Sequence, residues 1–309
     1  MSCRPPLHNG EHSCPTSADK SVCHRKDIVM RTFTHIINTG AGDRSLLAYI
    51  PTATQRSHYR GQRPAVVIYP GGAYSITFEG EAEPIALAFA SAGICAFVLH
   101  YSCKSRSHQV WPYAQTEAFA AIRFVRENAA EFGIRPDNIA ALGFSAGGHL
   151  CGCTGTLWNK PVMAPYLGDD PRASRPDKLI LCYPVIRAFA PCHHGSFVNL
   201  LGGEANCTPE MLEALSLERQ VDDETPPSFI WTTSEDTGVP IQGALEFAHA
   251  LADHHVHGEM HLYPHGGHGL CLGNQVTENR PYGSPVTCAE WIQGAIRFLY
   301  DDGVTSPVR

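Results

Sequence analysis

The chain has 309 residues, 43% of them hydrophobic, and a formal net charge of -7 at pH 7. This composition supports a sizeable core, and the acidic balance offers no basic surface for nucleic acid. No apolar run approaches the ~20 residues of a membrane span, so we expect neither nucleic acid nor a membrane as a partner. The N-terminus lacks the apolar stretch of a secretory signal, which favours a cytoplasmic location.

Twelve cysteines and 17 histidines invite a metal-site interpretation. None of the cysteines has the paired Cys-x-x-Cys spacing of a structural zinc site. Several, such as Cys95 and Cys182, fall in apolar segments where a thiol packs as a small hydrophobic group. We therefore expect unpaired thiols and no metal site.

The first 26 residues are polar and show no periodicity, which predicts a loose extension before a single catalytic domain over residues 27–303. Residues 31–37 and 45–50 read as two strands joined by a turn, a hairpin pattern. Residues 64–69 form a continuous apolar run, typical of a strand buried on both faces. The remaining predicted elements are helix 84–92, strand 94–99, helix 113–132, a turn at 135–138, strand 138–142, a helix from 148, strand 178–183, strand 228–233, helix 240–254, strand 258–263 and helix 284–300.

Alternation of apolar strands with helices indicates an α/β protein with one doubly wound, mostly parallel sheet. Residues 185–225 break the alternation with only short helical potential, notably at 209–217. Segments that follow strand ends in open α/β sheets often carry specificity, so we expect a small lid or insertion there.

Residues 143–147, Gly-Phe-Ser-Ala-Gly, lie between the apolar strand and the next helix. A serine on such a strand-to-helix turn needs a strained backbone, and small flanking residues avoid clashes. The new helix also directs free N–H groups toward the reacting atoms. We therefore predict Ser145 as a nucleophile.

The buried strand 64–69 ends at Pro-Gly-Gly-Ala-Tyr, residues 70–74. Glycines at this place let backbone amides point into a cleft. An oxyanion hole would take its donors here, from Gly72 and Ala73, together with the amide of Ala146.

A serine nucleophile needs a histidine base and a carboxylate that orients it, later in the chain and after strand ends. Strand 228–233 is followed by Glu235 and Asp236, and strand 258–263 is followed by His265 and His268. Because these loops follow successive strands, a catalytic role for their side chains is favoured over a role as solvated surface residues. The pattern alone leaves both carboxylates and both histidines as candidates.

These motifs together resemble the α/β-hydrolase esterases, in particular the bacterial acetyl xylan esterase and feruloyl esterase-like group, related to the hormone-sensitive-lipase branch. The matching residues are 70–74, 143–150, 226–240 and 263–269, with further similarity at 127–133 and 199–202. The resemblance covers residues 30–300. It implies an α/β-hydrolase fold in which Ser145 is the nucleophile, Asp236 the acid and His268 the base. Many relatives carry His-Gly-Gly-Gly where residues 70–73 of this chain are Pro-Gly-Gly-Ala, so the departures are Pro70 and Ala73.

The resemblance implies a carboxylesterase that acts on short, acetyl-type esters through an acyl-enzyme, with xylan or another acetylated carbohydrate as the substrate class, and without a cofactor. Alternatives are an amidase or peptidase on the same scaffold, a feruloyl-type esterase, and a non-catalytic ligand-binding module. Tyr74, Trp111 and Trp158 are candidates for the substrate pocket, although lone aromatic residues more often pack in cores. His149, four residues after Ser145, is expected to support the turn. We expect a monomer or homodimer.

Overall fold

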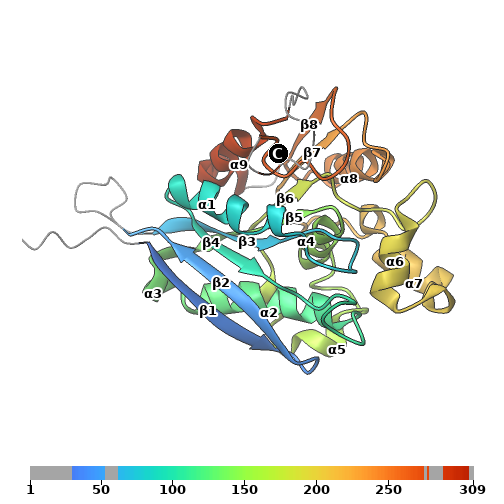
Figure 1. Cartoon of the computed structure of the whole chain (residues 1–309), viewed down its shortest axis with the longest axis horizontal. Helices are drawn as coiled ribbons and strands as arrows, with labels where there is room; N and C mark the ends of the chain where they lie inside the picture. The colour runs from blue at the N-terminus through green and yellow to red at the C-terminus, as the bar shows by residue number, and fades with distance from the viewer. Residues whose placement is uncertain (1–29, 53–61, 275–276, 278–287, 306–309) are drawn as a thin grey trace, which may run out of the picture.

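The computed structural model describes residues 30–52, 62–274, 277 and 288–305, so the predicted extension over residues 1–26 lies outside the described part (Figure 1). Eight strands form one sheet in the order β1-β2-β4-β3-β5-β6-β7-β8. The strands are β1 Arg31–Asn38, β2 Asp43–Ile50, β3 Arg63–Tyr69, β4 Cys95–Leu99, β5 Ile134–Phe144, β6 Lys178–Cys182, β7 Ser228–Thr233 and β8 Gly258–Tyr263.

The sheet is antiparallel at one edge and parallel elsewhere. β1 pairs antiparallel with β2, and β2 pairs antiparallel with β4, which confirms the predicted hairpin. From β4 through β3 to β8 every neighbouring pair is parallel. The carboxyl ends of these six strands therefore meet at one edge of the sheet.

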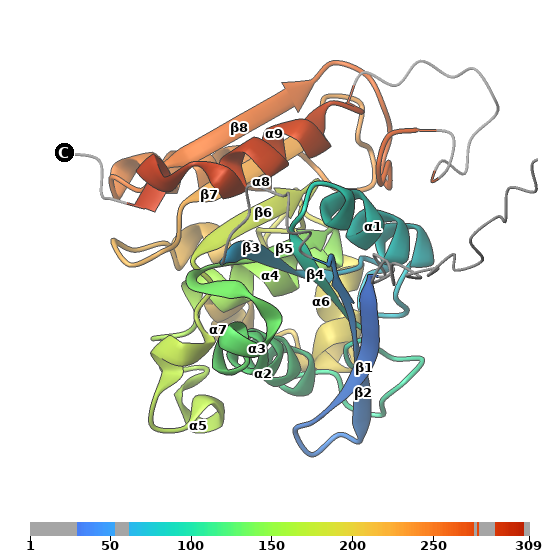
Figure 2. The same cartoon turned by 90° about the vertical axis from the view of Figure 1, so that its left-hand side faces the viewer.

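Helices cover both faces of the sheet. Figure 2 shows α1 and α9 on one face and α2 and α4 on the other, and the side chains of α8 belong to the same core as those of α2 and α4. The α-helices of the described residues are α1 Glu83–Ser91, α2 Tyr113–Glu127, α3 Ala129–Phe132, α4 Ala146–Thr156, α5 Ala164–Leu167, α6 His194–Leu201, α7 Pro209–Leu215, α8 Gln242–Asp253 and α9 Trp291–Tyr300. Short 3-10 turns are η1 Glu79–Glu81, η2 Pro171–Ser174, η3 Glu204–Asn206, η4 Leu217–Arg219 and η5 Asp302–Thr305.

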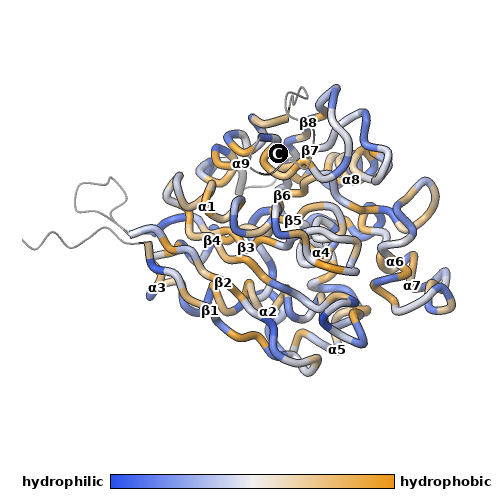
Figure 3. The backbone as a smooth tube through the Cα atoms, viewed as in Figure 1, coloured by the Kyte–Doolittle hydropathy of each residue, from blue (hydrophilic) through white to orange (hydrophobic). Residues whose placement is uncertain are grey.

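Strand β3 shows why its apolar run is continuous. Every residue of the strand is buried. Val67 and Tyr69 point into the core shared with α2 and α4, whereas Val66 and Ile68 point into the core shared with α1 and α9. Side chains alternate between faces along a strand, so a strand covered on both sides must be apolar at every position. Hydrophobic colour accordingly follows much of the central strands in Figure 3.

Three predicted boundaries were wrong. The helix over 113–132 divides at Asn128, whose side-chain amide donates to the carbonyl of Phe124 at 2.8 Å and competes with the helical pattern. The turn at 135–138 lies within β5, where the pairing with β3 shifts register. The last helix begins at Trp291, and its expected start at 284–285 lies outside the described residues.

The segment from 185 to 225 joins β6 to β7 and carries α6, η3, α7 and η4 (Figure 1). Its role as a lid stays a prediction. None of the cysteines in the described part of the chain forms a disulfide, as the sequence predicted. Within the same residues, no helix combines the length and apolar character needed to cross a membrane.

Candidate active site

Three side chains from separate loops meet at the carboxyl edge of the sheet. Ser145 follows β5, Asp236 follows β7 and His268 follows β8. His268 Nε2 lies 2.7 Å from Ser145 Oγ, and His268 Nδ1 lies 2.7 Å from Asp236 Oδ2. These hydrogen bonds form a continuous relay from carboxylate through imidazole to hydroxyl, the geometry that a nucleophilic serine requires.

The backbone at Ser145 is strained in the way the motif predicts. Its φ is 54° and its ψ is -119°. A Cβ atom on Gly143 would lie 2.0 Å from the carbonyl oxygen of Gly147, and one on Gly147 would lie 2.1 Å from that of Tyr69. Since real side chains cannot approach so closely, both flanking positions require glycine, and the turn between β5 and α4 stays tight.

Backbone hydrogen bonds hold Asp236 in place independently of its contact with His268. Its carboxylate is fully buried, and its Oδ1 accepts the backbone N–H groups of Gly238 (2.8 Å) and Val239 (2.9 Å). Its Oδ2 is therefore the oxygen directed at His268. Buried carboxylates are tolerated when both oxygens are hydrogen-bonded, as they are here, and this one holds the imidazole in a single orientation.

The other acid–histidine candidates pair with each other instead. His265 Nδ1 lies 3.0 Å from Glu235 Oε1, and both side chains are more than half exposed. The carboxylate of Glu235 also accepts the N–H of Gly266 at 3.0 Å. The structure brings neither residue to Ser145.

The turn at residues 70–74 places free donors beside the serine. Gly72, Ala73 and Tyr74 have φ values of 127°, 55° and 56°. Gly72 and Ala73 line the cavity that contains Ser145. No described residue accepts a hydrogen bond from the backbone N–H of Gly72, Ala73 or Ala146. These are the donors that an oxyanion hole would use.

The cavity at Ser145 measures about 420 Å³, within the usual range for a small-molecule site. Sequence reasoning missed six of its lining residues: Gly269 and Leu270, which follow His268, and four others. Ile76 and Phe78 give it an apolar wall, Glu81 lies at its inner surface, and His193 reaches it from the loop before α6. Only their nearness to the 70–74 turn could have indicated Ile76, Phe78 and Glu81, and no local pattern marked His193. The remaining lining residues are Gly72, Ala73, Ser145, His268, Gly269 and Leu270.

Burial lowers the pKa of His193, and nearby His268 lowers it further. Its ring accordingly favours the neutral form, while Nδ1 lies 2.9 Å from Ser196 Oγ. A neutral imidazole at the cavity wall adds no positive charge beside His268.

None of the three aromatic residues predicted for the substrate pocket lines the cavity at Ser145. Tyr74 is 1% exposed and hydrogen-bonds His149. Trp158 is buried beneath the guanidinium groups of Arg172 and Arg175. Trp111 packs against the main core. Large aromatic side chains bury more apolar area in the core than in a small open cavity, which is the physical reason for the correction.

His149 supports the turn from beneath, as expected. The side chain is fully buried, with Nδ1 2.8 Å from the hydroxyl of Tyr74 and Nε2 3.0 Å from the carbonyl oxygen of Leu215. Nε2 must donate to that carbonyl, so Nδ1 accepts from Tyr74 and the ring is neutral. Burial lowers the pKa of His149 to about 4.

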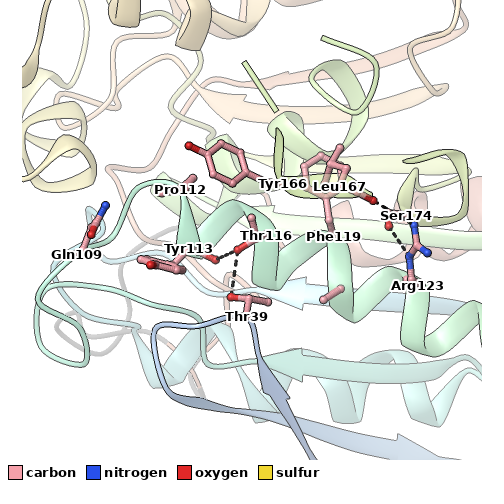
Figure 4. A pocket seen from close by; sticks show the side chains of 11 residues that line it. Thr39, Gln109, Pro112, Tyr113, Thr116, Phe119, Arg123, Tyr166, Leu167 and Ser174 are labelled. Carbon is pink, nitrogen blue, oxygen red and sulfur yellow. Dashed lines mark hydrogen bonds between the residues drawn. The ribbon is translucent and has the colours of Figure 1, made fainter. Parts of the chain in front are cut away.

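A second hollow, of about 630 Å³, lies between α2 and α5 (Figure 4) and shares no lining residue with the cavity at Ser145. Tyr113 and Tyr166 stand on its walls. Arg123, at one end, donates to Ser174 Oγ at 3.1 Å and to the carbonyl oxygen of Leu167 at 3.5 Å. Its guanidinium group is therefore committed to holding the surrounding chain.

One group of potential metal ligands occurs on the surface of the described residues. The ligand atoms of His194, Glu204 and Cys207 lie within 4.8 Å of one another. His194 Nε2 is already 2.9 Å from the carboxylate of Glu204. None of the three lines the cavity at Ser145. That the reaction proceeds without a metal stays a prediction.

Comparison with known proteins places this geometry in a family, since the model of the BD-FAE family matches residues 49–251. The chain belongs to the BD-FAE family. It is 37% identical over 219 residues to the endo-1,4-beta-xylanase B of Butyrivibrio fibrisolvens, covering 69% of this chain and 33% of that protein. It is 31% identical over 215 residues to the acetylxylan esterase of Xylanibacter ruminicola, covering 68% of this chain and 41% of that protein.

A solved structure is similar to this chain over most of its length. The acetyl ester-xyloside bifunctional hydrolase of Caldicellulosiruptor lactoaceticus is 35% identical, with a TM-score of 0.72, and the match covers 86% of this chain and 90% of that one. The fold is that of the α/β hydrolases, and the predicted resemblance to this esterase group is confirmed. The chain spans less than half the length of the two curated relatives above.

Proposed function

We propose that this BD-FAE protein is a serine carboxylesterase that hydrolyses short-chain acyl esters by way of an acyl-enzyme. The observation that carries the proposal is the relay from Asp236 through His268 to Ser145, with two hydrogen bonds of 2.7 Å. The naming of similar proteins as an acetylxylan esterase and an acetyl ester-xyloside hydrolase supports ester hydrolysis as the reaction class.

In the first half-reaction Ser145 Oγ attacks the ester carbonyl while His268 Nε2 takes its proton. Asp236 keeps Nδ1 protonated and stabilises the imidazolium that forms. The carbonyl oxygen becomes an oxyanion, and the N–H groups of Gly72, Ala73 and Ala146 are the donors available to it. Loss of one such donor typically costs ~3 kcal/mol of transition-state stabilisation.

The imidazolium then gives its proton to the departing alcohol, which leaves Ser145 acylated. In the second half-reaction His268 removes a proton from water, which attacks the acyl carbonyl. The tetrahedral intermediate collapses, the proton returns to Ser145 Oγ, and the carboxylic acid is released.

The acyl group we favour is acetyl, carried by xylan or another acetylated carbohydrate. The cavity of about 420 Å³ opens beside the serine and has only a short apolar wall, from Ile76 and Phe78. These two side chains are 50% and 39% exposed, so a long acyl chain would remain largely in water. The carbohydrate part of the proposal is supported by the names of the relatives alone.

The test measures hydrolysis of p-nitrophenyl acetate, butyrate and octanoate, and acetate release from acetylated xylan, by the wild type and by Ser145→Ala. We expect turnover that declines with chain length and disappears in the variant. Activity that survives in Ser145→Ala would overturn the triad. Wild-type cleavage of acyl anilides in preference to esters would favour an amidase, and release of ferulate in preference to acetate would favour a feruloyl-type esterase.

A further inference from the structure

A buried carboxylate lines the cavity and has no part in the relay. Glu81 ends η1, the short turn before α1, and is 3% exposed. It lies at the inner surface of the same cavity as Ser145 and His268. Carboxylates are seldom buried this deeply without a partner, so its contacts are informative.

One oxygen of Glu81 holds the turn that precedes the free donors. Oε2 accepts the backbone N–H of Gly71 at 2.6 Å. Gly71 comes immediately before Gly72 and Ala73, which line the cavity and whose N–H groups have no acceptor among the described residues. A Cβ atom on Gly71 would lie 2.7 Å from this same oxygen, so glycine permits the contact. The carboxylate therefore fixes where the following two amides point.

The other oxygen holds the side chain that packs against the histidine. Tyr183 donates its hydroxyl hydrogen to Glu81 Oε1 at 2.6 Å, and the same hydroxyl oxygen accepts the N–H of Cys271 at 3.0 Å. The ring of Tyr183 meets the ring of His268 edge to face, with centroids 5.0 Å apart. Tyr183 adopts a φ of 35°, a conformation that persists only where the surroundings enforce it.

The two contacts require an acceptor on each side. Gly71 N–H and Tyr183 O–H both donate to Glu81, so the ionised carboxylate satisfies both, whereas an isosteric amide can accept from only one of them. Burial raises the pKa of Glu81, whereas its hydrogen bonds to Tyr183 and Gly71 and the nearby His268 oppose that rise. Within the described part of the chain no Lys or Arg forms an ion pair with Glu81. Two charge-assisted hydrogen bonds take the place of such an ion pair.

We propose that Glu81 is a positioning residue that sets the distance between the oxyanion donors and His268. Among the described residues, its carboxylate is the one group that bonds both the 70–74 turn and the side chain packed on His268. Small displacements of reacting groups cost large factors in rate, so this link acts on turnover rather than on substrate binding. The inference rests on the proposed function.

The test compares Glu81→Gln with the wild type. The amide keeps the shape but has one acceptor oxygen: with that oxygen at Tyr183 its NH₂ faces the N–H of Gly71, and with it at Gly71 the Tyr183 hydroxyl must accept and its own hydrogen loses its acceptor. We expect kcat for p-nitrophenyl acetate to fall about 10- to 100-fold, with KM within about threefold of the wild type. Tyr183→Phe removes the second contact and the acceptor of the Cys271 N–H, leaves the Gly71 contact in place, and should cost less kcat. The double variant should be no slower than Glu81→Gln, because the two changes break one network.

Glu117→Gln is a matched control. Glu117 is also a fully buried carboxylate, and its oxygens accept from the N–H and the hydroxyl of Ser102, both at 2.6 Å; unlike Glu81 it also has an ion pair, with Arg44 Nε 3.4 Å from Oε1. It does not line the cavity at Ser145. We expect Glu117→Gln to lower the thermal midpoint and to leave kcat within about threefold of the wild type. If both variants lose kcat equally at equal loss of stability, Glu81 has only a structural role.

Two further readouts separate this inference from the proposed function. A trifluoromethyl ketone forms an oxyanion on the serine, and its affinity for Glu81→Gln should fall by the same factor as kcat/KM. The rate at which a fluorophosphonate probe labels Ser145 should fall about 10- to 100-fold. A wild type that the probe does not label would overturn the proposed function and this inference together. A labelled wild type and an equally fast, folded Glu81→Gln variant would overturn this inference alone.

Discussion

Two acid–histidine pairs span the same two loops of this protein, yet only one reaches the serine. Asp236 and His268 are joined at 2.7 Å, and Glu235 and His265 at 3.0 Å. The carboxylate of Asp236 is fully buried, whereas Glu235 and His265 are both more than half exposed. A hydrogen bond of similar length therefore serves different purposes at the two places.

The difference lies in anchoring and dielectric surroundings. Asp236 is held by two backbone N–H groups, and its histidine continues to Ser145 Oγ. The outer pair closes the loop through Gly266 and faces water, where an ion pair contributes about 0–1 kcal/mol. The buried pair, whose orientation the fold fixes, is placed to act on Ser145. The exposed pair helps to hold the loop that carries both histidines.

Substitution of the two histidines should separate the pairs most sharply. His268→Ala removes the base, and we expect kcat/KM for p-nitrophenyl acetate to fall by on the order of 10⁴- to 10⁶-fold. His265→Ala removes an exposed partner and should change it by about twofold or less. A large loss in His265→Ala with little loss in His268→Ala would reverse the assignment of the base.

The two carboxylates should differ by a similar margin. Asp236→Asn replaces an acceptor at Nδ1 with an amide and favours the wrong tautomer of His268, so we expect a loss of about 10⁴-fold in kcat. Glu235→Gln should retain most of the activity and lower the thermal midpoint by a few degrees at most. Comparable losses in the two variants, measured on folded protein, would contradict the distinction between buried and exposed acids.

His149 shows how burial changes the pKa of a histidine outside the triad. Because burial lowers the pKa of His149 to about 4, the unfolded chain, with a pKa near 6.5, takes up its proton first as the pH falls. Its contribution to stability is therefore complete above about pH 6.5 and decreases toward pH 4, by about 3 kcal/mol. Urea unfolding at pH 7.5, 6, 5 and 4 should show a smaller loss in His149→Gln than in the wild type. Identical pH dependence in both proteins would contradict the burial effect.

The smallest expected effect concerns the residue packed against His268. A Cβ atom on Gly238 would lie 3.0 Å from His268 Cβ, tight enough to shift the ring by a few tenths of an ångström. Gly238→Ala should lower kcat about tenfold and leave the free energy of unfolding within about 1 kcal/mol of the wild type. Full activity in this variant would mean that the loop absorbs the shift without moving the imidazole.

Local patterns in the sequence determined most of the fold. The apolar run of β3 required cover on both faces, and the glycines around Ser145 marked the sharp turn after β5, because each rule depends on backbone geometry within a few residues. The order of serine, acid and histidine after successive strands indicated which loops meet, since parallel strands bring their carboxyl ends to one edge.

The pattern of residues left both members of each pair open, and the resemblance to the esterase group pointed to Asp236 and His268; the tertiary structure decided how each pair is held and what else lines the cavity. Asp236 differs from Glu235 by one position, and its burial and its two backbone N–H donors distinguish it. His193 and Glu81 come from segments with no catalytic pattern, and Trp158 turned out to lie under two arginines. The reason is physical: side-chain contacts across distant segments depend on packing between elements, which no local spacing encodes.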